Sequence, residues 1–201
     1  MTKIKICGIT QPSEIAYINE TQPDYCGFVI NVADRRRSVT PEQVRLMTRN
    51  LSEKVLAVGV FVDAPVKLIV DLLSEKVIQM VQLHGQEDEA YIKQLKRLTD
   101  QPLIKAFNIS SAQDVEQATN SSAEYILLDN GNGGTGQTFD WSLLDKVKRP
   151  FILSGGLSPT NIPEAIASLH PYGLDISSGV EKNGVKDKEK MVAAVRRTRN
   201  V

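Results

Sequence analysis

Cys7 and Asp129 are the two side chains whose types and positions best suit proton-transfer chemistry. Cys7 ends the apolar run KIKIC directly before a glycine, and Asp129 ends the run YILLD before Asn-Gly. A thiolate can act as a base or a nucleophile if its neighbours lower its pKa from about 8.5, and a carboxyl group can donate a proton. Each residue also has an ordinary structural interpretation, as a small buried thiol and as a turn-forming aspartate.

Two serine- and glycine-containing turns lie near the end of the chain. They read Ser154-Gly155-Gly156 and Ser177-Ser178-Gly179. Glycine allows backbone N–H groups to approach a phosphate closely, and serine adds hydroxyl donors. The pair of turns therefore predicts a site for a phosphorylated ligand.

Three further features could take part in binding. One residue of Arg35-Arg36-Arg37 could hold a carboxylate with its planar guanidinium, although such a run is also common on solvated surfaces. His84 is expected either to hydrogen-bond the ligand or to be structural. The segment GNGGTGQ (131–137) matches G-x-G-x-x-G, but no acidic residue follows at the spacing that dinucleotide binding requires. We interpret it as a loop that folds over a ligand, with an exposed turn as the alternative.

A regular series of strands and helices must position these residues. Eight apolar, β-branched runs begin 22 to 29 residues apart, at 3–7, 25–30, 54–62, 78–83, 102–107, 124–128, 150–153 and 173–176. Segments with helical spacing separate them, with predicted helix starts at Thr40-Pro41, Ala64-Pro65, Ser110-Ser111, Ser158-Pro159-Thr160 and Lys186-Asp187.

This alternation predicts an α/β protein, because parallel strands need crossover connections that are usually helices. Eight units favour a compact, single-domain (β/α)8 TIM barrel over residues 1–201, with an open doubly wound sheet as the alternative. In such a barrel the active site lies at the carboxyl ends of the strands, and a phosphate site often follows the last two. Cys7, Asp129, His84 and both turns are therefore expected at one mouth.

Composition excludes several classes of partner. The 24 basic residues balance the 24 acidic ones, which predicts no nucleic-acid or anionic-membrane binding. The sequence contains no apolar run of the roughly 20 residues that a membrane span needs. Two cysteines form neither a disulfide framework nor a zinc signature, and the start MTKIKICGIT lacks the apolar core of a signal peptide. We expect a cytoplasmic protein.

The sequence resembles the phosphoribosylanthranilate isomerase family of tryptophan biosynthesis. The resemblance covers essentially the whole chain, and the combination of an early KICG with GGTG-x-x-FDW is its most specific part. The matching segments, in family order, are KICGIT (5–10), GFVI (27–30), RSVTP (37–41), VGVFV (58–62), VQLHG (81–85), LLD (127–129), GGTGQTFDW (133–141), LSGGL (153–157), P-x-N-I (159–162), DISSGVE (175–181) and KD (186–187).

The resemblance implies a (β/α)8 barrel that catalyses an Amadori rearrangement of N-(5-phosphoribosyl)anthranilate without cofactor or metal. Cys7 then matches the family's general base, Asp129 its general acid and Arg37 the arginine that holds the anthranilate carboxylate. By the same resemblance, His84 is expected to bind the substrate, and Gly155, Gly156, Ser178 and Gly179 match the family's phosphate-binding residues. The expected partner is the small phosphoribosyl substrate, and the chain is expected to be a monomer or a homodimer.

Two segments depart from the family pattern, and two other functions compete. Arg36 could replace Arg37 as the carboxylate ligand, and residues 182–185 lack the family's usual proline before glycine. One competing function is the related sugar-phosphate isomerase of histidine biosynthesis, which uses two aspartates where this chain has Cys7 and Asp129. The other is a non-catalytic sensor of phosphoribosyl ligands, which would need neither residue.

Overall fold

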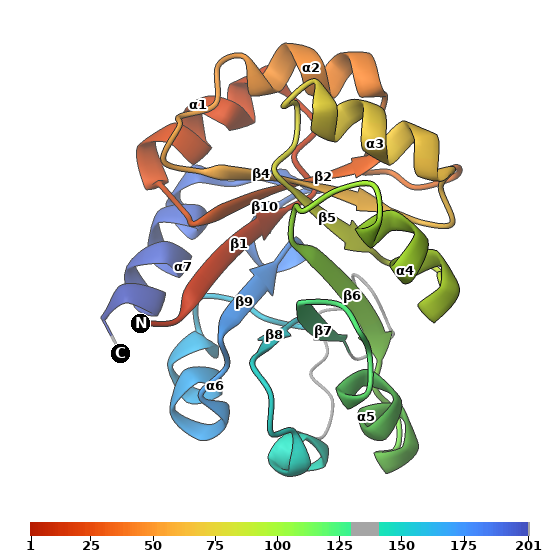
Figure 1. Ribbon diagram of the computed structural model, residues 1–201. Helices are drawn as coiled ribbons and strands as arrows, with labels where there is room; N and C mark the ends of the chain where they lie inside the picture. Colours follow the sequence, from red (N-terminus) through yellow and green to blue (C-terminus); the bar gives the residue numbers. More distant parts are fainter. Residues whose placement is uncertain (130–140, 201) are drawn as a thin grey trace.

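Eight parallel strands close into a barrel in the computed structural model, which describes residues 1–129 and 141–200 (Figure 1). β1 pairs with β9 on one side and with β2 on the other, so the sheet closes on itself. The predicted (β/α)8 barrel is confirmed, and the open sheet is excluded. The strands are β1 (Lys3–Cys7), β2 (Tyr25–Ile30), β4 (Leu56–Phe61), β5 (Met80–Leu83), β6 (Leu103–Asn108), β7 (Tyr125–Asp129), β8 (Phe151–Leu153) and β9 (Gly173–Ile176).

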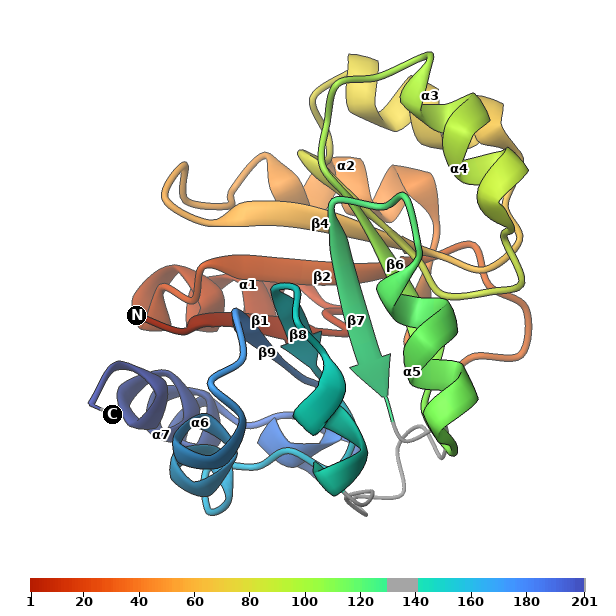
Figure 2. The same ribbon diagram turned by 60° about the horizontal axis from the view of Figure 1, so that its bottom comes forward.

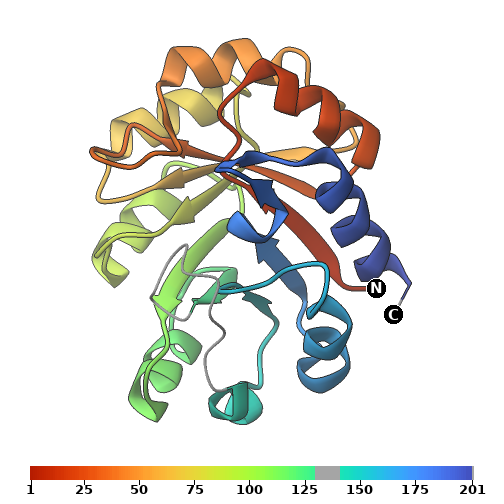
Figure 3. The ribbon, with the colours of Figure 1, turned by 180° about the vertical axis from the view of Figure 1, so that it is seen from behind.

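Helices surround the barrel, as Figures 1 and 3 show from opposite sides. Several begin at the predicted caps: Thr40, Ser111 and Asp187 each accept a backbone N–H from the first turn of the helix they precede. The helices are α1 (Pro12–Thr21), α2 (Pro41–Thr48), α3 (Val66–Ser74), α4 (Glu89–Lys96), α5 (Ala112–Thr119), α6 (Ile162–Leu169) and α7 (Lys188–Arg199).

The predicted course of the chain differs from the structure between β7 and α6. The connection to β8 contains a short 3-10 helix, η1 (Trp141–Lys146). α6 begins at Ile162 rather than near Pro159, because Ser158 donates its backbone N–H to Asn161 Oδ1 at 2.8 Å and forms a turn first. The predicted ligand-covering loop at 131–137 lies outside the described residues.

Three short strands were not predicted. β3 (Ser38–Val39) extends the sheet beside β2. β10 (Glu181–Lys182) and β11 (Val185–Lys186) form an antiparallel hairpin after β9. Gly184 at the hairpin turn has a φ of 82°, which glycine adopts without strain. This hairpin positions Glu181 and Lys186 beside the carboxyl end of β1.

The barrel interior is apolar at one end and polar at the other. Side chains alternate along each strand between the interior and the surrounding helices. The lower interior is filled by Tyr25, Val58, Met80, Ile104, Leu127 and Ile152, and a larger core packs between strands and helices. Above this apolar layer lie Lys5, Gln82 and Asp175, all buried. Figure 2 shows the barrel from a second direction, with the helices outside the strands. Within the described part of the chain, no helix is long and apolar enough to cross a membrane.

Candidate active site

A cavity of about 1510 Å³ opens at the carboxyl ends of the strands. It contains most of the residues that the sequence singled out, and it draws side chains from strands around the whole ring. The predicted residues that line it are Cys7, Arg35, Arg36, Arg37, His84, Asp129, Ser154, Gly155, Gly156, Ser177 and Ser178. The predicted gathering of these groups at one mouth is therefore confirmed.

Cys7 is the last residue of β1 and is 8% exposed. Its register partner on β2 is Gly27, where a Cβ would lie only 2.8 Å from Cys7 Sγ. The absent side chain at Gly27 thus makes room for the sulfur. Burial raises the pKa of the Cys7 thiol, and the nearby Lys5 ammonium partly offsets that effect by its charge and by a hydrogen bond.

Lys5 and Asp175 form a buried ion pair below Cys7. Lys5 Nζ lies 3.0 Å from each carboxylate oxygen of Asp175, and the two residues are register partners on β1 and β9. The side chains of Lys5 and Asp175 are only 1% and 7% exposed, respectively. Neither residue was recognised as a site residue from the sequence. The available signal was a charged residue inside each of two otherwise apolar runs, KIKIC and GLDI.

Asp129 ends β7, which lies three strands from β1 around the barrel by way of β8 and β9. Ser154, at the end of β8, donates its hydroxyl to Asp129 Oδ2 at 2.8 Å. The Asp129 backbone carbonyl accepts from Ile109 at 2.8 Å, which ties the strand end to the loop after β6. The carboxyl group is thus oriented by a neighbouring strand while it lines the cavity.

His84 follows β5 and lines the same cavity. Its Nδ1 lies 2.9 Å from Gln82 Nε2. Burial lowers the pKa of His84, and the negative charges of Asp129 and Asp175 only partly oppose that effect. The ring is therefore neutral at neutral pH. When Gln82 donates to Nδ1, the His84 proton lies on Nε2, where it is available to a ligand.

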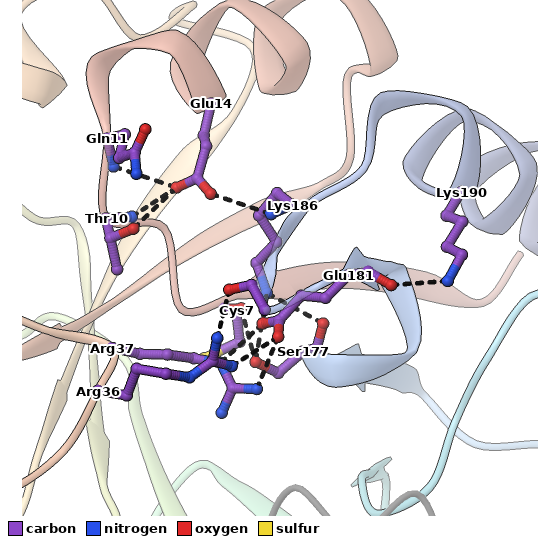
Figure 4. Close-up of polar contacts among 11 residues, drawn as sticks. Cys7, Thr10, Gln11, Glu14, Arg36, Arg37, Ser177, Glu181, Lys186 and Lys190 are labelled. Carbon is purple, nitrogen blue, oxygen red and sulfur yellow. Dashed lines mark hydrogen bonds and ion pairs between the residues drawn. The ribbon is translucent and has the colours of Figure 1, made fainter.

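Arg37 reaches the cavity from the loop before β3, and its position depends on Glu181 (Figure 4). Arg37 Nε and Nη2 donate to the two Glu181 oxygens at 2.7 and 3.0 Å, a two-pronged pair. Gly8, with a φ of 81°, lets the arginine pass close to Cys7, because a Cβ there would lie 2.5 Å from Arg37 Cδ. Arg37 is thus positioned beside the thiol.

The Glu181 carboxylate forms ion pairs with three cationic side chains. Besides Arg37, it accepts from Arg36 at 2.7 Å and from Lys186 Nζ at 2.9 Å. These partners overcome the opposing effect of burial and lower the pKa of Glu181 to about 2. Arg36 also donates to the Gly184 carbonyl, and its side chain is 55% exposed, against 25% for Arg37. Glu181 and Lys186 were not recognised as site residues from the sequence.

The two predicted phosphate turns lie side by side. Gly155 and Gly156 have φ values of 88° and 65°, which explains why glycine occupies both positions. A Cβ at Gly179 would lie 1.9 Å from the Leu157 carbonyl oxygen, so the turn after β9 packs directly against the one after β8. Gly155, Gly156 and Ser178 line the cavity. Gly179 supports this arrangement through its contact with the neighbouring turn.

The described residues do not form a metal centre. Across 1–129 and 141–200, no three His, Cys, Asp or Glu side chains lie close enough together to hold a metal ion. The polar groups at the mouth are instead a thiol, a carboxyl group, a neutral imidazole and several cations. Such a set can exchange protons with a ligand that carries negative charges.

Comparison with known proteins identifies close similarity along the full chain. A family model described as "N-(5'phosphoribosyl)anthranilate (PRA) isomerase" matches residues 4–197. The N-(5'-phosphoribosyl)anthranilate isomerase of Endomicrobium trichonymphae is 40% identical over 205 residues and covers all of both chains.

Solved structures give the same result. The phosphoribosylanthranilate isomerase of Thermotoga maritima aligns over all of both chains at 34% identity with a TM-score of 0.90. A second structure shows monomers generated from this isomerase, which is described there as dimeric. A phosphoribosylanthranilate isomerase in complex with reduced 1-(o-carboxyphenylamino)-1-deoxyribulose 5-phosphate aligns over all of both chains at 33% identity with a TM-score of 0.87.

Proposed function

The chain belongs to the N-(5'-phosphoribosyl)anthranilate isomerase family, and from that premise we propose that Cys7 is the general base and Asp129 the general acid of its reaction. The enzyme isomerises N-(5'-phosphoribosyl)anthranilate in tryptophan biosynthesis. The observation that carries the assignment of roles is the placement of a thiol and a carboxyl group, from strands far apart in the sequence, on one cavity.

Ring opening is the first chemical step. The Asp129 carboxyl group donates a proton to the ribose ring oxygen, and the bond between that oxygen and C1 breaks. The lone pair of the anthranilate nitrogen forms a double bond to C1, which gives a Schiff base. Ser154 orients the carboxyl group by donating to Oδ2 at 2.8 Å, so that the proton donor has a defined direction.

Proton abstraction from C2 is the second step. The Cys7 thiolate takes this proton, and the pair of electrons left behind forms a C1–C2 double bond while the nitrogen recovers its lone pair. The resulting enolamine tautomerises to the ketose as the C2 hydroxyl becomes a carbonyl and C1 gains a proton. Substrate and product are isomers, so the sequence of steps needs no external oxidant or reductant.

The remaining residues at the mouth are assigned to substrate binding. Arg37 holds the anthranilate carboxylate, because its guanidinium lies beside Cys7 and is directed there by Glu181, which it contacts through Nε and Nη2. Arg36 is assigned to the hairpin, since it bonds Glu181 and the Gly184 carbonyl. Gly155, Gly156 and Ser178 bind the phosphate with Gly179 supporting them, and His84 donates from Nε2.

The chain acts on its small phosphoribosyl substrate as a monomer or homodimer. A dimer is consistent with the description of the Thermotoga maritima relative. The two cysteines, Cys7 and Cys26, are both unpaired, which suits the reducing conditions of the cytoplasm. We place the activity there.

A fluorescence assay that follows consumption of freshly prepared phosphoribosylanthranilate tests the assigned roles. Cys7→Ser and Asp129→Asn should each lower kcat by about 10²- to 10⁴-fold, the usual contribution of a positioned acid or base, while a reduced product analogue still binds. Cys26→Ser, which alters the buried thiol on β2, is the control and should keep its activity. Unchanged turnover in Cys7→Ser would remove the base assignment, and unchanged turnover in Asp129→Asn would remove the acid.

A further inference from the structure

Lys5 lies next to Cys7 at the mouth of the barrel and has no part in the substrate binding proposed above. Lys5 and Cys7 are two residues apart on β1, so both side chains face the barrel interior. A Cβ at Gly27 would lie 2.8 Å from Cys7 Sγ and 3.0 Å from both Cε and Nζ of Lys5. The sulfur and the ammonium therefore share the space that this glycine leaves open.

Asp175 fixes the ammonium in that position. It is the register partner of Lys5 across the β1–β9 pair, and both of its oxygens lie 3.0 Å from Lys5 Nζ. A fully buried lysine retains its charge only when it is paired. The nearby Asp175 and Cys7 raise the pKa of Lys5 despite the opposing effect of burial, so the ammonium is charged at neutral pH.

The other charged groups near Cys7 are already engaged elsewhere. Lys186 on β11 and Arg37 in the loop before β3 both pair with Glu181. Asp175 carries a negative charge, which disfavours a thiolate. Among the described charged neighbours, Lys5 has the largest stabilising effect on an ionised Cys7, and it belongs to the same strand.

We propose that Lys5, anchored by Asp175, is a positioning residue that stabilises the ionised form of the Cys7 sulfur for proton abstraction. This inference rests on the proposed role of Cys7 as the base. Lys5 acts through the sulfur and takes no proton from the substrate. Stability alone is a weak reason for a buried ion pair, because well-packed apolar residues of similar volume can often replace one without loss of stability.

The rate at which iodoacetamide alkylates Cys7 as a function of pH tests the proposal. Peptide mass spectrometry identifies which cysteine is alkylated. Cys26, the other cysteine, is fully buried on β2, and this burial strongly raises its pKa, so it should react slowly. The informative variant is Lys5→Met/Asp175→Asn, which removes both charges and leaves neither partner as an unpaired buried ion. Lys5→Gln is a second variant that keeps a hydrogen-bond donor near Asp175 but lacks the charge.

The expected result is a rise of about 1 to 3 pH units in the alkylation midpoint of Lys5→Gln, the range typical of losing an adjacent opposite charge. The rise should be smaller in Lys5→Met/Asp175→Asn, because that variant also removes the Asp175 charge that disfavours a thiolate. At neutral pH, kcat should fall by about 10- to 10³-fold with little change in KM, and raising the pH should recover part of the loss. Lys5→Arg should restore part of the activity at neutral pH. Lys3→Met, on the same strand but in a surface pair with Asp24, should behave as wild type.

A folded Lys5→Met/Asp175→Asn or Lys5→Gln variant with the wild-type alkylation midpoint would overturn the proposal. A merely structural lysine would lower the unfolding temperature without moving that midpoint. The alkylation midpoint is also independent of whether Cys7 is the general base, because alkylation does not require turnover. Loss of the base assignment would appear instead as full activity in Cys7→Ser.

Discussion

Replacing Glu181 with glutamine tests whether one carboxylate organises the arginines at the mouth of the barrel. Glu181 is a buried anion whose side chain is 7% exposed and which contacts Arg36, Arg37 and Lys186. Glu181→Gln keeps the shape of the side chain but removes the charge. Three cations would then face one another without an anion between them, and Arg37 would lose the two-pronged contact that directs it.

The size of the stability change follows from the pKa of Glu181. The pKa falls from 4.5 to about 2 on folding, because its three cationic partners outweigh burial. At about 1.4 kcal/mol per pKa unit, this corresponds to roughly 3 kcal/mol of folding free energy at neutral pH. Since the folded-state pKa is the lower one, this contribution is complete above pH 4.5 and disappears as the pH falls toward 2.

Denaturant unfolding of wild type and Glu181→Gln between pH 7 and the acid range measures this contribution to the free energy of unfolding. The free energy of unfolding of Glu181→Gln should be lower than that of wild type by roughly 3 kcal/mol at pH 7, and the difference should shrink as the pH falls through the window between the two pKa values. KM for phosphoribosylanthranilate should also rise at pH 7, because Arg37 loses its direction.

Glu42→Gln is the matched control, because Glu42 is a 75% exposed partner of Arg45 in a surface pair at 3.4 Å. It should show no measurable change in stability or KM. A stability difference between Glu181→Gln and wild type that is absent, or that stays constant from pH 7 down to the acid limit of the fold, would refute the electrostatic reasoning.

Two further predictions concern substrate recognition and the space around the thiol. Arg37→Ala should raise KM for the carboxylated substrate about 10- to 100-fold, the value of a charge-assisted contact, and should raise KM for a decarboxylated analogue much less. Arg36→Ala should change KM for either substrate only weakly. An equal rise in KM for both substrates in Arg37→Ala would contradict the assignment. Gly27→Ala should lower kcat by about 10-fold or more, because its Cβ would lie 2.8 Å from Cys7 Sγ and displace the sulfur. Gly173→Ala, whose Cβ would meet its nearest neighbour at 3.4 Å, is the control and should retain kcat.

Much of the barrel was predictable because each strand–helix unit is specified locally. The eight apolar runs lie within two residues of the observed strands, and caps such as Thr40 and Ser111 mark helix starts. Two short-range signals were missed. The turn from Ser158 to Asn161 delays the start of α6, and Asn183-Gly184, a sequence typical of two-residue hairpin turns, was not used to predict the β10–β11 hairpin.

The candidate site was predictable only in part. Cys7, Asp129 and the serine and glycine turns could be identified because all of them end strands, and the ends of parallel strands meet at one mouth. Glu181 could not be identified, because its importance comes from Arg36 and Arg37, which lie 145 and 144 residues away in the sequence. Only closure of the barrel brings them together.

The sequence by itself therefore determined the order of the elements, the family and the residue types that can move protons. These properties follow from periodicity, capping and strand ends, which depend on near neighbours in the chain. Only the tertiary structure decided which charge faces which group. Lys5 meets Asp175 across 170 residues because β1 and β9 pair in one register, and Gly27 leaves the space in which Lys5 and Cys7 meet. A shift of that register by one residue would turn one of the two charged side chains out of the barrel interior.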